Sequence, residues 1–256
     1  MVEQVLAGKH VMVTGGAQGI GKAIVEDCLD KGATVSFLDF QADLGVSVAQ
    51  DLRQQGGDVH FAPCDITDAS ALEQAMSGFE EKLGHFAGLV NNAGRNSSAD
   101  PVEMTEAEWD SFFDLDLKAS WLTCKFALPG MRKAQAGSIV NIASIHAQMS
   151  YPNYFPYAAA KSGLLGLTRN LALDEGRHGI RVNTVSPGYT MTPLLQEWFD
   201  SVPGSMEKAL AVHPLGHFGE PRDVAAVVSF LLSDEARNVS GADFRVDGAL
   251  SARFAG

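Results

Sequence analysis

Seven short apolar runs alternate with longer segments of helical period, and this order leaves few folds open to the chain. The runs expected to form strands are 10–14, 34–39, 59–62, 88–91, 138–143, 181–185 and 243–246. Helical spacing of apolar residues covers 19–31, 41–54, 69–83, 105–133, 157–177 and 221–233. Because the strands are largely apolar along their whole length, both faces of their sheet must be buried. The sequence therefore predicts an α/β fold with a doubly wound, seven-stranded parallel sheet and helices on both faces.

Residues 1–256 are expected to form a single domain, because no repeat, low-complexity run or linker divides them. One segment, 189–217, breaks the alternation with three prolines and several large apolar residues. It follows the sixth strand at its carboxyl end, where α/β sheets bind their ligands. We predict that this irregular segment is a substrate lid, and the alternative is an ordinary pair of surface helices.

The charge and the cysteines of the chain restrict its partners and its compartment. A formal net charge of -12 argues against nucleic acid or an anionic membrane surface, and makes an acidic carrier protein a less natural partner. Cys28, Cys64 and Cys124 are far apart, as expected for reduced cysteines in the cytoplasm. No signal peptide is visible, and no run approaches the roughly 18 apolar residues of a membrane span. The expected partner is a small molecule in the cytoplasm.

A glycine-rich turn follows the first strand, with glycines at positions 15, 16, 19 and 21, and a helical pattern begins at once after it. Glycine permits a tight turn and lets backbone N–H groups approach a pyrophosphate at a helix N-terminus. The spacing Gly-x-x-x-Gly-x-Gly differs from the common Gly-x-Gly-x-x-Gly dinucleotide fingerprint. A plain strand-to-helix turn therefore remains the alternative when the loop is considered alone.

Asp39 ends the second strand, about 20 residues past the loop, where an acidic side chain accepts hydrogen bonds from an adenosine ribose. An anion there repels a 2′-phosphate, so the sequence predicts NAD rather than NADP. No Arg or Lys between Gly15 and Gly21 offsets that charge. Asp39→Ser combined with Gly16→Arg is expected to move the preference toward NADP. The alternative for Asp39 is a solvated carboxylate at a strand end.

Five motifs occur in order: Thr14–Gly21, Asn91–Gly94, Ser144, Tyr157-Ala-Ala-Ala-Lys161 and Pro187-Gly188. Each is modest alone, but the ordered set resembles the short-chain dehydrogenase/reductase family from His10 to Gly248. The resemblance implies a Rossmann-type sheet and an oxidoreductase that acts on CH–OH groups. It also implies that Ser144 holds the substrate oxygen and that Lys161 binds the nicotinamide ribose.

The spacing of Tyr157 and Lys161 suits this chemistry. A hydride leaves a carbinol carbon only when the hydroxyl proton is removed, and a ketone accepts a hydride more readily when its oxygen is protonated. A phenol, with an ordinary pKa near 10, does both when a positive charge favours its phenolate. Tyr157 and Lys161 are four residues apart on one helical face, whereas Tyr151 and Tyr154 have no lysine at that spacing.

The resemblance further implies the residues that contact the cofactor. Asp65 matches the acidic residue that contacts the adenine in the family, and the alternative is an aspartate that caps a helix or makes a turn. The implied cofactor contacts are Gly15, Gln18, Gly19, Ile20, Gly21, Asp39, Phe40, Asp65, Ile66, Asn92, Ala93, Gly94, Tyr157, Lys161, Pro187, Gly188, Thr190 and Thr192.

One position departs from the family pattern. The family commonly has an Asn in the fourth long helix, where it completes a proton relay, and this chain has Asp116. The resemblance implies that the backbone carbonyl at this position holds a relay water, in which case Asp116→Asn retains substantial activity. A carboxylate near Lys161 would also favour the charged lysine, and a purely structural helix kink is the other alternative. We include Asp116 with Ser144, Tyr157 and Lys161 as candidate catalytic residues.

Polar side chains flank the catalytic motifs, and we expect them to face the substrate. Hydrogen-bonding groups left unpaired by an apolar substrate disfavour it, which predicts a polyhydroxylated substrate. Similarity to bacterial sugar and sugar-acid dehydrogenases of the family points the same way. The candidate substrate residues are Ser144, His146, Asn153, Tyr154, Tyr157, Arg95 and Asn96, with Gln148 and Tyr151 nearby.

Two other functions remain open. Reduction of 3-oxoacyl groups on an acyl carrier protein is the alternative within the family, although such reductases usually carry Arg where this chain has Leu173. A non-catalytic dinucleotide-sensing protein is the alternative of another class, but Tyr157 and Lys161 are both present. The resemblance also implies a homotetramer, assembled through the helices predicted at 105–133 and 157–177 and through the last strand. The histidines have no metal-ligand spacing, so no metal is expected.

Overall fold

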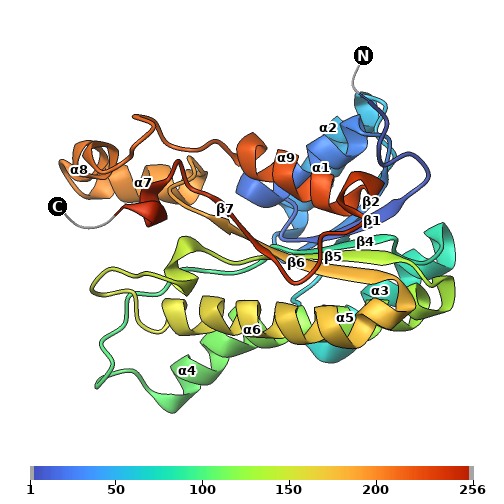
Figure 1. Cartoon of the computed structure of the whole chain (residues 1–256), viewed down its shortest axis with the longest axis horizontal. Coiled ribbons are helices and arrows are strands. Elements are labelled where there is room, and N and C mark those ends of the chain that lie inside the picture. The colour runs from blue at the N-terminus through green and yellow to red at the C-terminus, as the bar shows by residue number, and fades with distance from the viewer. Residues whose placement is uncertain (1–2, 254–256) are drawn as a thin grey trace.

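A computed structural model describes residues 3–253. Within them, seven parallel strands form one sheet in the order β3-β2-β1-β4-β5-β6-β7, as Figure 1 shows. The strands are β1 (His10–Thr14), β2 (Thr34–Asp39), β3 (Val59–Pro63), β4 (Gly88–Asn91), β5 (Gly137–Ile142), β6 (Ile180–Pro187) and β7 (Asp243–Val246). The predicted α/β fold is confirmed.

Helices cover both faces of the sheet (Figure 1). One layer consists of α1 (Gly19–Asp30), α2 (Ala42–Gln54) and α9 (Pro221–Leu232). The opposite layer consists of α3 (Ala69–Leu83), α5 (Ala119–Ala134) and α6 (Tyr157–Glu175). A further helix, α4 (Glu106–Phe113), continues through a π turn, Asp114–Lys118, into α5. The predicted helix 105–133 is therefore one continuous element with a widened turn in its middle.

Alternate residues of β1 explain why the sheet needs two layers of helices. Val11 and Val13 lie in the apolar core beneath α1 and α9, whereas Met12 lies in the core beneath α3 and α5. All three side chains are fully buried. Successive side chains of a strand point to opposite faces, so a strand that is apolar throughout has to be covered on both sides.

The strand order reverses between β1 and β4, which are neighbours in the sheet although β2 and β3 intervene in the sequence. At such a point the loops that follow the two strands diverge, and a crevice opens at the carboxyl ends. The loop after β1 is the glycine-rich turn, and the loop after β4 carries Asn92, Ala93 and Gly94. The topology thus brings two of the predicted motifs together.

The segment 189–217, predicted to be irregular, contains two short helices, α7 (Pro193–Ser201) and α8 (Ser205–Ala211), as the alternative of a helix pair had it. Thr192 caps α7, because its side chain accepts from Leu195 N, and Pro193 occupies the first turn. Gly204, with a φ of 74°, separates the two helices. Pro193 therefore starts a helix. Both helices lie to one side of the two main helical layers (Figure 1).

Candidate active site

The glycine-rich turn is closed tightly around its own backbone. Gly15 and Gly19 have positive φ values of 67° and 55°, which favour glycine. A Cβ added at Gly21 would lie 1.9 Å from the carbonyl oxygen of Gly15, so any side chain there would displace the turn. Gln18 has an extended backbone just before α1 begins at Gly19. The N-terminus of α1 adjoins the glycine-rich loop, and the first helical turn of α1 has no acidic residue. The turn is shaped for a group that needs backbone N–H donors.

Asn92 holds the loop after β4 against this turn. Its side-chain Nδ2 donates to the carbonyl oxygens of Thr14 and Gly15, at 3.0 and 3.1 Å. The hydroxyl oxygen of Thr14 accepts from the backbone N–H groups of Asn92 and Ala93. Asn92 therefore acts on the cofactor site by fixing the glycine turn.

The loop after β6 reaches the same place. A Cβ added at Gly19 would lie 3.4 Å from Cγ2 of Thr192. Thr190 is buried, and its hydroxyl donates to the carbonyl of Gly188 at 3.3 Å. The geometry thus brings the glycine turn and the segment after Pro187-Gly188 together, as the sequence analysis expected.

Asp39 lies buried at the end of β2, close to the glycine turn. Its carboxylate accepts from Ala17 N at 3.1 Å and from Gln41 N at 3.0 Å. These two donors hold the carboxylate in place, while each oxygen keeps a lone pair for another donor. The next residue, Phe40, is 76% exposed, which is unusual for so large an apolar side chain.

The surroundings of Gly16 and Asp65 bear on two of the predictions for this part of the site. Gly16 has no room for a side chain, because a Cβ there would lie 2.7 Å from Cβ of the buried Phe37. The Gly16→Arg variant considered above would therefore disturb the core. Asp65 makes a turn: its Oδ1 accepts from the backbone N–H and the hydroxyl of Thr67. It is exposed, whereas Ile66 beside it is buried.

The catalytic candidates come from β5, α6 and the π turn. Tyr157 is the first residue of α6, and Lys161 lies one turn further along the helix, nearly fully buried. Nζ of Lys161 is 5.5 Å from the centre of the Tyr157 ring. Ser144 follows β5, and its hydroxyl accepts from His146 N at 3.2 Å, which caps the short 3₁₀ turn Ile145–Ala147.

Asp116 contacts Lys161 directly. Its Oδ1 lies 3.3 Å from Nζ of Lys161, and both oxygens accept from Arg95 N at 3.2 Å. Burial raises the pKa of Asp116, and the charge of Lys161 is the largest opposing cause. Of the alternatives weighed for this position, the carboxylate near Lys161 is the one with a direct contact in the structure.

The mouth of the site is more aromatic than the sequence suggested. The His146 ring stacks on Tyr154, with centroids 4.4 Å apart, and meets the edges of Tyr151 and Tyr157, at 5.6 Å each. Burial lowers the pKa of His146, so its ring is neutral at pH 7. Tyr189, which is not among the predicted site residues, also belongs to the mouth. Burial raises the pKa of its phenol, and the neighbouring phenols of Tyr151 and Tyr154 raise it further.

Tyr189 could have been found from the sequence, because it directly follows the Pro187-Gly188 motif. It also connects the mouth to α7, since its ring stacks on Trp198 with centroids 6.4 Å apart and an interplanar angle of 17°. The chain has four tyrosines, and all of them gather at this mouth. That convergence is not visible from their spacing.

Several polar groups expected to face the substrate already have partners. The guanidinium of Arg95 donates to the Ser111 hydroxyl at 3.0 Å and lies over the Phe112 ring. Gln148 donates to Asp243 at 2.7 Å. The exposed Asn153 and Asn96, in contrast, have no side-chain hydrogen bond within residues 3–253. The polarity of the mouth is therefore lower than the residue types alone indicate.

Within the part of the chain that the structure describes, no group of three or more His, Cys, Asp or Glu side chains is placed to hold a metal ion. Likewise, none of the helices between residues 3 and 253 is long and apolar enough to cross a membrane.

Comparison with known proteins assigns the chain to a family of oxidoreductases. The family model described as enoyl-(acyl carrier protein) reductase matches residues 15–251. L-fucose dehydrogenase from Mus musculus is 38% identical, over 94% of this chain and 88% of its own length. A 3-oxoacyl-(acyl-carrier-protein) reductase from Thermotoga maritima is 35% identical, over 96% of this chain and 98% of its own.

A solved structure agrees with these relatives. Levodione reductase superposes with a TM-score of 0.91 at 32% identity, over 97% of this chain and 100% of the other. The matches span nearly the whole chain, so the sheet, the glycine turn and the residues around Tyr157 all lie within the shared region.

Proposed function

Because the chain belongs to the short-chain dehydrogenase/reductase family and is an oxidoreductase acting on CH–OH groups, we propose that it is NAD-dependent. We propose further that its substrate is a small polyhydroxylated alcohol or ketone, such as a sugar or sugar acid, oxidised at a secondary alcohol or a hemiacetal carbon. The observation that supports this best is the pairing of Tyr157 with Lys161, whose Nζ lies against Gly94 in the loop that packs on the glycine turn, with His146, two residues after Ser144, against the Tyr157 ring. Assay of sugars, sugar acids and polyols by NADH absorbance tests it.

The residues present fit a dinucleotide. The glycine turn leaves no space for side chains at Gly15 and Gly21, which keeps backbone N–H groups accessible at the start of α1. Asp39 would hold the adenosine ribose, and the exposed ring of Phe40 would pack beside the adenine. Thr190 and Thr192 would meet the carboxamide. When bound, the nicotinamide supplies the hydride acceptor or donor.

The remaining chemistry belongs to this chain. The Ser144 hydroxyl orients the substrate oxygen, and Tyr157 removes the hydroxyl proton during oxidation or returns it during reduction. The positive charge of Lys161, 5.5 Å from the Tyr157 ring, favours the phenolate. The aromatic mouth excludes water around the proton being transferred.

The identity of the cofactor rests on Asp39. Its carboxylate is fixed by Ala17 N and Gln41 N and cannot turn away from a 2′-phosphate without breaking both hydrogen bonds. An NADP phosphate would lie against this charge, whereas the two ribose hydroxyls of NAD can donate to it. This supports NAD.

The aromatic mouth supports a sugar ring as substrate. Tyr151, Tyr154 and the neutral His146 form an aromatic cluster, and its uncovered ring surface is where the C–H groups of a sugar ring would pack. Nδ1 of His146 lies 3.0 Å from the Ser150 hydroxyl, which leaves Nε2 as the ring nitrogen that would meet a substrate hydroxyl. A sugar offers both the apolar ring face and the hydroxyl donor.

His146→Ala is expected to raise KM for the sugar substrate about tenfold, as for the loss of one hydrogen bond and a ring contact, with little change in KM for NAD. Initial rates with varied sugar and varied NAD measure this. Ser150→Ala is the matched control, since it removes only the partner of Nδ1 and should change KM far less. Equal increases in the two KM values would contradict the assigned role.

Reduction of 3-oxoacyl thioesters is the second candidate, because a relative with that name is 35% identical. Two observations count against it. The net charge of -12 would repel an acidic carrier protein, and α6 has the 80% exposed Leu173 where such reductases usually have a cation. Robust thioester reduction without activity on any polyhydroxylated compound would establish this alternative. Hydride transfer to any substrate would exclude a purely dinucleotide-sensing role.

We also propose a cytoplasmic homotetramer whose α7–α8 segment, within the single domain 1–256, acts as a substrate lid. The lid proposal rests on Trp198 of α7, which stacks on Tyr189 at the mouth. The cytoplasm rests on Cys28, Cys64 and Cys124, which are free and buried. Neither nucleic acid nor a membrane is proposed as a partner.

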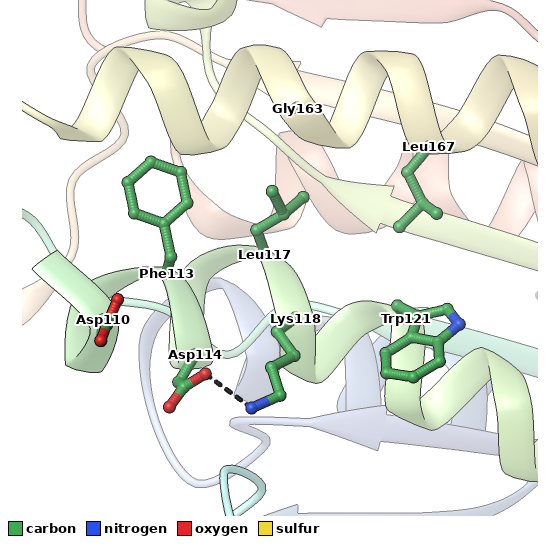
Figure 2. Close-up of a pocket in the computed structure, with 8 residues that line it drawn as sticks. All are labelled: Asp110, Phe113, Asp114, Leu117, Lys118, Trp121, Gly163 and Leu167. Atoms are coloured by element: carbon green, nitrogen blue, oxygen red, sulfur yellow. Dashed lines mark hydrogen bonds and ion pairs between the residues drawn. The ribbon is translucent and has the colours of Figure 1, made fainter.

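The helices that would pair in the tetramer carry an apolar groove. Figure 2 shows Leu117 pointing toward Gly163 of α6, with Phe113, Trp121 and Leu167 along the groove, whose volume is about 380 Å³. Leu117 already fills the space above Gly163, because a Cβ there would meet its Cδ2 at 2.8 Å. Trp121 is 46% exposed, so part of its ring is free to pack on a second copy.

Trp121→Glu is therefore expected to dissociate the tetramer to a smaller species, since it would bury a charge at the contact. Light scattering after gel filtration measures the mass. Lys133→Glu, which changes the charge at the far end of α5, is the control. A wild-type chain that is monomeric at micromolar concentration would remove the tetramer proposal.

A further inference from the structure

Asp116 and Lys161 form a buried pair of opposite charges at the centre of the site. Their side chains are 0% and 5% exposed, and the nearest oxygen lies 3.3 Å from Nζ. Other charged or titratable groups face the pair from two directions: Tyr157 from α6 and Arg95 from the loop after β4. The guanidinium of Arg95 is engaged with Ser111, so its backbone N–H is what reaches the carboxylate.

The π turn directs Asp116 toward Lys161. A π turn contains one more residue than an α turn, which rotates the side chains that follow it around the helix. Two aspartates belong to the turn, and they point to different places. Asp114 lies on the surface and pairs with Lys118 at 2.8 Å, whereas Asp116 is buried against Lys161.

Gly94 provides the space for this contact. A Cβ at Gly94 would lie 2.8 Å from Oδ1 of Asp116 and 3.1 Å from Nζ of Lys161. The loop after β4 therefore approaches the pair as closely as a backbone can, and Arg95 N completes the carboxylate's hydrogen bonds. The carboxylate has two polar partners, Nζ of Lys161 and Arg95 N, in a place that excludes bulk water, so its charge is screened less than a surface charge would be.

This carboxylate opposes the effect of Lys161 on Tyr157. The lysine charge stabilises the phenolate, and a negative charge 3.3 Å from the lysine cancels part of that field. An amide at this position would leave the lysine charge uncancelled. We propose that Asp116 is a positioning residue that raises the working pH of this enzyme by partly neutralising Lys161.

The proposal rests on the proposed function only for the identity of the proton-transferring group. Asp116→Asn is expected to move the pH at which Tyr157 loses its proton, and the inflection of kcat for alcohol oxidation, to more acidic values. The sign follows because removing a negative charge stabilises the phenolate. The removed charge lies within about 10 Å of the Tyr157 ring, since Nζ of Lys161 is 3.3 Å from Asp116 and 5.5 Å from the ring centre, and at an effective dielectric of about 20 we expect a shift of about one pH unit or more.

Two measurements keep the test independent of the substrate. Tyrosinate absorbance is titrated in the wild type and in Asp116→Asn, and the contribution of Tyr157 is isolated by subtracting the titration of the matching Tyr157→Phe protein. The kcat profile is then measured with whichever alcohol is oxidised. Failure to oxidise any sugar would overturn the substrate assignment and leave the titration result standing.

Asp114→Asn is the matched control, because it removes the same charge from the same π turn but at the surface, where Asp114 pairs with Lys118. It should shift neither the titration nor the kcat profile. Asn at position 116 keeps an acceptor for Arg95 N, and unchanged unfolding temperatures would show that the fold is intact. An unshifted or alkaline-shifted inflection in Asp116→Asn would overturn the proposal, as would an equal shift in Asp114→Asn.

Discussion

Tyr157→Phe is expected to lower kcat for alcohol oxidation by at least ~100-fold, the usual loss when a general acid–base group is removed. The ring and its contacts with His146 and Tyr154 remain, so the change removes little beyond the hydroxyl. Lys161 keeps its buried pairing with Asp116. Cofactor affinity should therefore survive, and titration of NADH fluorescence measures it separately from turnover.

Tyr154→Phe is the matched control for this experiment. Its ring lies 6.4 Å from that of Tyr157, and burial raises the pKa of its phenol. A tyrosine whose proton is held more tightly and which lacks a lysine one turn away is a poor general base, so this variant should keep most of its kcat. Near-normal turnover in Tyr157→Phe, or an equal loss in Tyr154→Phe, would exclude the mechanism proposed for Tyr157.

Asp39→Asn combined with Phe40→Arg is expected to change the ratio of kcat/KM for NADP to that for NAD by ~100-fold or more in favour of NADP. Removing the carboxylate ends the repulsion of a 2′-phosphate, and an arginine forms paired hydrogen bonds with phosphate oxygens. Position 40 suits the arginine because Phe40 is exposed and a long side chain meets no core residue. Initial rates with both cofactors measure the change.

The choice of Asn and of position 40 follows from the hydrogen bonds of Asp39. An amide oxygen retains an acceptor for either Ala17 N or Gln41 N, so one of the two contacts survives. Arginine at Gly16, by contrast, would collide with Phe37. Phe40→Arg alone is the control, and it should move the ratio less than the double variant. A wild type that prefers NADP would contradict the reading of Asp39.

Most of the fold could be predicted because its signals are periodic. Strands β1, β2, β4 and β7 have the predicted bounds, β3 differs by one residue at one end, and β5 and β6 differ by one or two residues at both ends. The glycine turn and the pairing of Tyr157 with Lys161 are also local features, since a strand-to-helix turn and one turn of helix set them. The predictions were weakest at α7 and α8, where short helices framed by prolines have too few turns to show a period.

The environment of each polar side chain could not be predicted in the same way. Arg95 and Gln148 have the residue types of substrate-binding groups, but packing gives them Ser111 and Asp243 as partners. Residue type determines how many hydrogen bonds a group can make, and the neighbours brought by the fold determine how many are left for a substrate. Sequence reasoning therefore overestimated the polarity of the mouth.

Local order along the chain was enough to specify the parallel sheet, the dinucleotide turn and the Tyr157–Lys161 pair, because each depends on residues within a turn or a strand of one another. Asp116 against Lys161, and Tyr189 against the other tyrosines, depend instead on how separate elements pack. A π turn and a glycine loop decide which way Asp116 faces, and the placement of β6 beside β5 decides what Tyr189 meets. The residues in each of these contacts are far apart in the sequence, so the contacts exist only once the tertiary structure has formed.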